Sequence, residues 1–221
     1  MKTLKWLILI TILFNLTIKG NKMDNIFLSE VIATRLSHDL IGNIGAVSNA
    51  VELLNEGDEQ DLDDVKNILN FSSLVLNKRL KFFRLCFGLS NASVKTLDEL
   101  KEICQNYLTT IGNPNFLINL DLEISTPKIY KFVMPAVMMM ADVIIKGGNI
   151  SVKETASHLE INVTSDANLN LSKLNGISDI LNNIDVSDNI SSYAPLYYLL
   201  YYANNSGVKI KLKNSSLLIG E

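Results

Sequence analysis

One short segment, TRLSHDLIGNIGAVSNAVELL at residues 34–54, places a histidine directly before an aspartate. A neutral imidazole is nucleophilic at physiological pH and can form a covalent phosphoryl intermediate. The carboxylate of Asp39 can hydrogen-bond the second ring nitrogen of His38, which fixes the tautomer and offsets the charge that develops during transfer. Arg35 lies one helical turn upstream, where it can either meet phosphoryl oxygens or pair with a neighbouring acid. His38 and Asp39 are therefore the candidate catalytic pair.

The helical period places His38 away from the apolar stripe of its own segment. Leu36 and Leu40 each lie two residues from His38, so at about 100° per residue the histidine lies about 160° from both. Each glycine inside a helix costs about 1 kcal/mol relative to alanine. Two glycines beside an exposed histidine indicate space for another molecule, although a surface histidine beside a flexible bend is the alternative. The expected neighbours on this exposed face are Thr34, Arg35, Ile41, Gly42 and Gly45, of which all but Thr34 are candidate phosphoryl or partner contacts.

The composition favours a globular protein that buries a sizeable core. Hydrophobic residues make up 48% of the 221 residues and charged residues 19%, with a net charge of −3. No block of lysine and arginine stands out, so nucleic acid is not an expected partner. Cys86 and Cys104 lack CxxC spacing, and no histidine cluster accompanies them. This pattern indicates free thiols in a reducing compartment and argues against a structural zinc site.

The first 22 residues, MKTLKWLILITILFNLTIKGNK, allow three interpretations. Their apolar run of roughly fifteen residues is short for the ~20 that span a bilayer, and no A-x-A-like cleavage site follows. The segment is a signal sequence, a marginal membrane anchor, or an extension upstream of the true start. We favour the last, because Met23 opens an ordinary cytosolic beginning. We therefore expect a cytoplasmic protein, with membrane association if residues 1–22 are retained.

Two long helices with a short link are predicted for residues 26–56 and 62–87, because apolar residues recur at steps of three and four. Such a hairpin leaves much apolar surface uncovered, and a homodimeric four-helix bundle would bury it. We expect much of the bundle core to come from Ile44, Val47, Val51, Leu54, Leu69, Leu76 and Phe83.

The pattern changes after GLSNAS at 88–93, a plausible boundary between a hairpin domain at 23–90 and a second domain at 94–221. Thr96 and Glu99 have capping-box spacing and predict the start of a helix over 96–111. A long buried helix is predicted from about Pro127 to Gly147-Gly148. Further helices are expected near 171–183 and 193–206, and strands near 116–124, 149–155, 158–165, 208–214 and 215–220. The fold class is α+β, with a sheet covered by helices on one face.

These segments resemble the ChpT-type histidine phosphotransferases, relatives of the two-component histidine kinases, over nearly all of 26–220. The most specific match is the histidine segment, with its histidine-aspartate pair, its glycine-alanine turn and its ELL ending. Three later segments are similar to the corresponding parts of the family's sequences: KRLKFFRLCFG, KFVMPAVMMMADVIIKGGNISV and YAPLYYLLYYANNSGVKI. Two positions depart from the pattern: Asn43 replaces a common proline, and Gly42 replaces a polar residue. The second change puts phosphatase activity in doubt, because glycine has no side chain to orient water.

The resemblance implies a C-terminal domain that is a degenerate histidine-kinase ATPase-like α/β sandwich. If Gly147-Gly148 is matched to the glycines of the histidine kinases, Met139 stands where a kinase has its Mg²⁺-binding asparagine, and a thioether is a poor ligand for Mg²⁺. The best candidate for the adenine motif, SDANLN at 165–170, contains no glycine, and no GxGxG precedes the last helix. We therefore expect no ATP binding and no intrinsic cofactor or metal.

The function that the resemblance implies is a phosphorelay between receiver domains. His38 would accept a phosphoryl group from a receiver aspartate of a hybrid histidine kinase and pass it to a response regulator. Mg²⁺ would come with the partner receiver domain. Two alternatives remain: an ATP-dependent kinase with an aberrant site, and a non-catalytic dimeric adaptor in which His38 is incidental. His158, in a predicted strand without a nearby acid, is expected to be structural.

Overall fold

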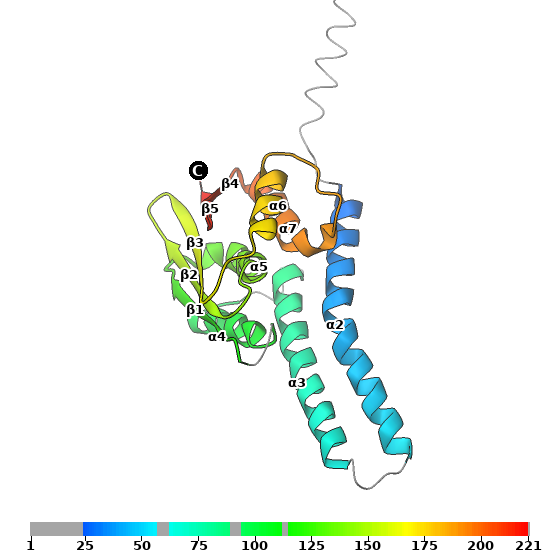
Figure 1. Ribbon diagram of the computed structural model, residues 1–221. Coiled ribbons are helices and arrows are strands. Elements are labelled where there is room, and N and C mark those ends of the chain that lie inside the picture. Colours follow the sequence, from blue (N-terminus) through cyan, green and yellow to red (C-terminus); the bar gives the residue numbers. More distant parts are fainter. Residues whose placement is uncertain (1–23, 57–61, 89–93, 112–114, 221) are drawn as a thin grey trace, which may run out of the picture.

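The computed structural model describes residues 24–56, 62–88, 94–111 and 115–220. Two long antiparallel helices, α2 (Asn25–Glu56) and α3 (Leu62–Phe87), form the predicted hairpin (Figure 1). Asp24 accepts a hydrogen bond from the Ile26 amide at 3.0 Å and so caps the start of α2. Asp63 and Asp64 place negative charge in the first turn of α3, where it complements the helix dipole. None of the helices described has both the length and the apolar composition needed to cross a bilayer. The expectations for residues 1–22 lie outside the described ranges.

The second half is α+β, as predicted, with a five-stranded sheet in the order β1-β2-β3-β5-β4. Strands β1 and β2 are parallel, and the other neighbouring pairs are antiparallel. The strands are β1 (Ile118–Glu123), β2 (Gly148–Glu154), β3 (His158–Ser165), β4 (Lys209–Lys213) and β5 (Ser216–Gly220). The helices are α4 (Leu97–Leu108), α5 (Tyr130–Ala141), α6 (Leu171–Leu181) and α7 (Ala194–Ser206), with 3-10 turns η2 (Pro127–Ile129) and η3 (Ile190–Tyr193).

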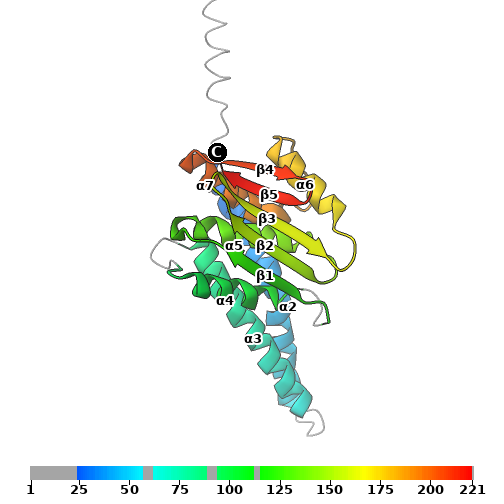
Figure 2. The same cartoon turned by 90° about the vertical axis from the view of Figure 1, so that its left-hand side faces the viewer.

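All these helices lie on one face of the sheet, as Figure 2 shows. Buried and more exposed residues alternate along β1, β2 and β3, so one face of the sheet is packed and the other faces solvent. Helix α5 is central to the core, because every residue in it except Lys131 is buried. The capping hydrogen bond predicted for α4 is present, with the Glu99 amide donating to Thr96 Oγ1 at 3.2 Å.

The prediction of one helix from Pro127 to Gly147-Gly148 is wrong in its length. Helix α5 ends at Ala141, and the two glycines instead lead into β2. Gly147 and Gly148 have φ values of 54° and 147°, which other residues rarely adopt. A Cβ atom on Gly148 would lie 2.1 Å from the carbonyl oxygen of Thr164, so the close approach of β2 to β3 requires glycine. The early end of α5 leaves Asp142 just beyond the helix, next to α2.

The hairpin is buried at one end and apolar but exposed at the other. Phe83, expected in the bundle core, instead belongs to the core of the single chain, where its ring lies 5.9 Å from that of Tyr107. This assignment was wrong because the last turns of α3 pack against α4. Several hairpin residues remain exposed in one chain: Ile44, Val51, Leu54, Leu62, Ile68, Phe71, Leu74 and Leu80.

Candidate functional site

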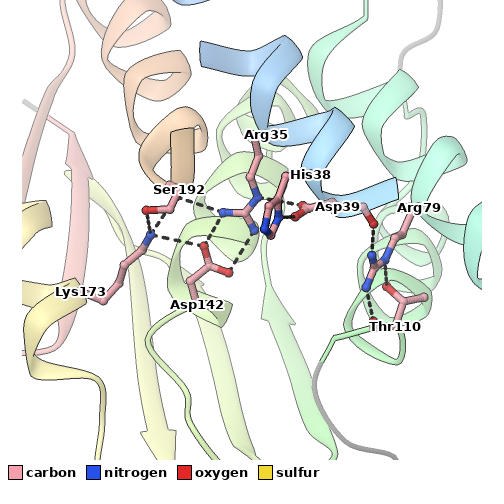
Figure 3. Close-up of polar contacts among 8 residues, drawn as sticks. All are labelled: Arg35, His38, Asp39, Arg79, Thr110, Asp142, Lys173 and Ser192. Atoms are coloured by element: carbon pink, nitrogen blue, oxygen red, sulfur yellow. Dashed lines mark hydrogen bonds and ion pairs between the residues drawn. The ribbon is translucent and has the colours of Figure 1, made fainter. Parts of the chain in front are cut away.

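His38 projects from the middle of α2 into solvent, with Asp39 beside it (Figure 3). The histidine side chain is 82% exposed and the aspartate side chain 15%. Nδ1 of His38 lies 3.4 Å from Oδ1 of Asp39, a long contact that can tighten when a substrate binds. A proton on Nδ1 would be donated to this carboxylate, leaving the lone pair of Nε2 free. The two adjacent residues therefore have the geometry of a nucleophile and the group that orients it.

Arg35 does not share the exposed face predicted for it. The residue is only 8% exposed, and its Nε donates to Oδ2 of Asp39 at 2.8 Å. Its terminal nitrogens donate to Oδ2 and Oδ1 of Asp142 at 2.7 and 3.1 Å. Burial acts to lower the pKa of Arg35, but the negative charges and hydrogen bonds of its partners outweigh burial and raise the pKa above its ordinary value. Of the two interpretations from the sequence, pairing with a neighbouring acid is the one observed.

Asp142 and Lys173 extend this ion pair into the second half of the chain, and neither was a predicted site residue. Lys173 Nζ donates to the backbone and side-chain oxygens of Ser192, both at 2.8 Å, and lies 3.5 Å from Oδ2 of Asp142. It also lies 4.0 Å from the centre of the Tyr193 ring. Arg35 donates to the Ser192 carbonyl at 3.1 Å, so this residue of η3 accepts from both cations. Figure 3 shows these side chains converging from α2, α6 and the end of α5.

Arg79 of α3 binds the turn of α2 that carries His38 and Asp39. It donates to the backbone carbonyl of Asp39 and, through Nε and Nη2, to the side-chain and backbone oxygens of Thr110 at 3.2 and 2.6 Å. Arg79 therefore connects both hairpin helices to Thr110, two residues beyond the end of α4. Its position in the sequence gave no signal, because an arginine in an amphipathic helix normally faces solvent.

A cavity of about 970 Å³ lies beside the network, between α2 and the segment formed by α6 and η3. His38 and Asp39 line one side, and Asp142 and Lys173 line the other. The outer side of His38 is also open. Gly42 and Gly45 are exposed, and a Cβ atom on either would meet nothing within 4 Å. Ile41 and Thr34 are both exposed, as predicted, and the Thr34 hydroxyl donates to the Glu30 carbonyl at 2.8 Å.

The residues considered for nucleotide binding lie elsewhere. Met139 is fully buried in α5. Asp166 follows β3, where its carboxylate lies near Gly147.

The second histidine and the two cysteines also lie outside the site. His158 is the first residue of β3, and its Nδ1 lies 3.0 Å from Ser157 Oγ. Cys86 and Cys104 are buried and free, and burial raises the pKa of both thiols.

The architecture is similar to that of a solved bacterial phosphotransferase. A solved protein described as the 1.7 Å structure of a bacterial phosphotransferase has a TM-score of 0.70 and 20% sequence identity to this chain. The comparison covers 90% of this chain and 97% of the other.

A sequence relative carries a more particular name. Protein phosphotransferase ChpT of Brucella abortus (strain 2308) is 31% identical over 71 residues, which are 32% of this chain and 33% of that protein. The match therefore spans about a third of the length of the relative. No protein-family model matches the chain. The resemblance to the ChpT-type phosphotransferases is nevertheless borne out by both comparisons.

Burial of Lys173 predicts a pH-dependent stability. Burial is the main cause that lowers the pKa of Lys173 from 10.5 to about 8; Arg35 adds to the lowering and Asp142 opposes it. Above about pH 8 the folded protein has released a proton that the unfolded chain keeps to about pH 10.5, so this residue's contribution to stability rises with pH in that window. In this pH window, the free energy of unfolding of the wild type should increase relative to that of Lys173→Met by on the order of 1 kcal/mol per pH unit. Urea unfolding of both proteins between pH 7 and 10 measures this difference, and parallel curves would contradict it.

Proposed function

We propose that this protein is a histidine phosphotransferase that moves phosphoryl groups between receiver domains of a two-component phosphorelay. The observation that carries the proposal is the exposed imidazole of His38 with the carboxylate of Asp39 against its Nδ1 side. A nucleophile that must meet an aspartyl phosphate on another protein has to be accessible, whereas the group that orients it can be partly buried. His38 and Asp39 meet these two requirements.

The proposed chemistry balances without a cofactor. The lone pair of His38 Nε2 attacks the phosphorus of an aspartyl phosphate, the N–P bond forms, and the bonding electrons of the P–O bond leave with the receiver's carboxylate. The proton stays on Nδ1, so the product is a phosphorylated imidazolium whose positive charge faces Asp39. The return step breaks the N–P bond and forms an acyl phosphate on the response regulator. Positioning and charge neutralisation are the protein's contributions.

Partners supply the remaining parts of the reaction. The proposed donor is a receiver domain of a hybrid histidine kinase, the acceptor is a response regulator, and the receivers bring the Mg²⁺. The second half of the chain has a structural or docking role in this scheme and takes no nucleotide. Met139, at the position aligned with a kinase's metal-binding asparagine, lies in the core without an oxygen to offer. No particular observation favours the alternatives of an aberrant kinase or a non-catalytic adaptor.

Transfer between purified proteins tests the proposal. A receiver domain carrying radiolabelled aspartyl phosphate is mixed with the full chain, and label is followed with time. The label should appear on this chain in an acid-labile, alkali-stable form, as expected for phosphohistidine, and then move to a second receiver domain. Label that never leaves a panel of receivers, or that enters from ATP instead, would contradict the proposal.

Receivers are proposed to dock on the exposed patch formed by Ile41, Gly42 and Gly45. Gly45→Arg should block transfer, because a long charged side chain would fill the space beside His38. The fold should persist, because a Cβ atom at this position meets nothing within 4 Å and arginine has a higher helix propensity than glycine. Transfer assays with Asn67→Arg, an exposed position on α3, provide the matched control. A normal rate for Gly45→Arg would place the docking surface elsewhere.

A homodimer through the hairpin is proposed to cover the apolar residues exposed in one chain. Val51, 45% exposed, belongs to the predicted dimer stripe, whereas Leu53, 42% exposed, lies about 200° away around the helix. Val51→Glu should yield folded monomers, since a buried unpaired carboxylate costs several kcal/mol. Leu53→Glu should remain dimeric. Light scattering at micromolar concentration measures both, and a monomeric wild type would contradict the proposal.

A further inference from the structure

The orientation of Asp39 depends on a residue more than a hundred positions away in the chain. One oxygen of Asp39 faces His38 Nδ1 at 3.4 Å, and the other accepts from Arg35 Nε at 2.8 Å. The guanidinium of Arg35 is in turn held by both oxygens of Asp142, at 2.7 and 3.1 Å. The planar guanidinium donates in fixed directions, so a bidentate partner also fixes the direction of Nε.

We propose that Asp142 is a positioning residue for phosphoryl transfer: acting through Arg35, it sets the carboxylate of Asp39 against His38. The inference rests on the proposed function of His38. It gives the second half of the chain a part in the chemistry, since Asp142 follows α5 and not a hairpin helix.

The charges of these ion-paired residues also indicate that Asp142 supports phosphorylation of His38. Arg35 and Lys173 carry two positive charges, and Asp39 and Asp142 carry two negative charges, so the group of four is neutral. Removing the charge of Asp142 leaves two cations beside one carboxylate, that of Asp39. Arg35 would then be free to turn towards Asp39, and the carboxylate would stabilise a positive imidazole less well. Both effects slow phosphorylation of His38.

The competing explanation is that Asp142 only ties α2 to the second half of the chain. Buried ion pairs do hold elements together, and removing one partner costs stability. The two explanations differ in their dependence on Asp39. A tether loosens the site whatever residue stands at position 39, whereas a positioning residue acts only while Asp39 is there to be positioned.

The test is a double-mutant cycle on the full chain with phosphoramidate, a small donor that phosphorylates histidine with release of ammonia and needs no partner protein. Asp142→Asn should slow phosphorylation of His38 by roughly 10- to 100-fold in the wild-type background, as expected for a displaced reacting group. In the Asp39→Asn background it should slow the reaction by less than about 3-fold, because coupled residues are not additive. Equal losses in the two backgrounds would overturn the proposal.

A second measurement uses no phosphoryl donor. The chain has two histidines, so the ring nitrogen signals of His38 and His158 can be distinguished by NMR. Asp142→Asn should shift the neutral His38 ring away from the tautomer with the proton on Nδ1, as Asp39→Asn is also expected to do, and should leave His158 unchanged. An unaltered tautomer in folded Asp142→Asn protein would refute the inference.

Arg35→Lys provides a further variant if Asp142→Asn does not fold. It keeps the positive charge, but a single ammonium cannot reproduce the fork that joins two carboxylates, so the same tautomer shift is expected. Failure of phosphoramidate to label His38 in the wild type would instead defeat the proposed function, while the NMR result would still report on the positioning of Asp39.

Discussion

His38→Gln should abolish phosphoryl transfer outright. Glutamine keeps a polar side chain of similar reach, but its amide nitrogen is not a nucleophile at neutral pH. No neighbouring residue can take over, because the carboxylate of Asp39 is held by Arg35, and Arg35 and Lys173 are both ion-paired with Asp142. The side chain of His38 is 82% exposed, so its replacement should change the free energy of unfolding by less than about 0.5 kcal/mol.

The other histidine of the chain offers the matched control. His158→Gln removes an imidazole from the start of β3 and should transfer phosphate at the wild-type rate. The measurement is a time course of label moving from a phosphorylated receiver onto each variant. Label that appears on folded His38→Gln protein would refute the assignment of His38 as the phosphorylated residue. Loss of transfer in folded His158→Gln protein would also contradict it.

The elements were largely predictable because their periodicities are local. Apolar steps of three and four define the hairpin, and Thr96 and Glu99 mark the start of α4 by their spacing alone. The end of α5 was misplaced because apolar residues resume after Asp142 and continue to Ile145, and one polar residue is not a stop signal. Asp142 is the polar residue at the C-cap of the helix. Its partner on α2, Arg35, is far away in the sequence, so no local pattern could predict the pair.

In the site, too, the local relations were predictable from the sequence and the tertiary contacts were not. His38 and Asp39 are adjacent in sequence, and Arg35 is four residues from Asp39 on the same helix, so their proximity follows from helix geometry. Burial of Arg35 does not follow, because it requires η3 and the end of α5 to pack against α2. Arg79 reaches the Asp39 carbonyl, and Lys173 reaches Asp142 and Ser192, through tertiary contacts. A lysine or arginine in an amphipathic helix gives no sign of such contacts.

Asp39→Asn should slow phosphoryl acceptance without eliminating it. Asparagine keeps the size of the side chain and an oxygen that can accept from His38 Nδ1, but it loses the charge that offsets the positive phosphoimidazole. Positioned groups of this kind typically contribute ~10²–10⁴-fold, so a loss in this range is expected. A residual rate should remain because the nucleophile itself is intact.

The structure adds a stability cost that the sequence did not suggest. Asp39 is 15% exposed and pairs with buried Arg35, so replacing its carboxylate removes a partly buried ion pair. Arg35 keeps both bonds to Asp142 in the variant, and Arg79 still binds the backbone carbonyl of residue 39. The turn should therefore stay folded, and thermal unfolding would verify this before rates are compared. A rate equal to wild type in folded Asp39→Asn protein would leave His38 as the nucleophile but remove any role for its neighbour, and with it the reason for Arg35 and Asp142 to hold that carboxylate in place.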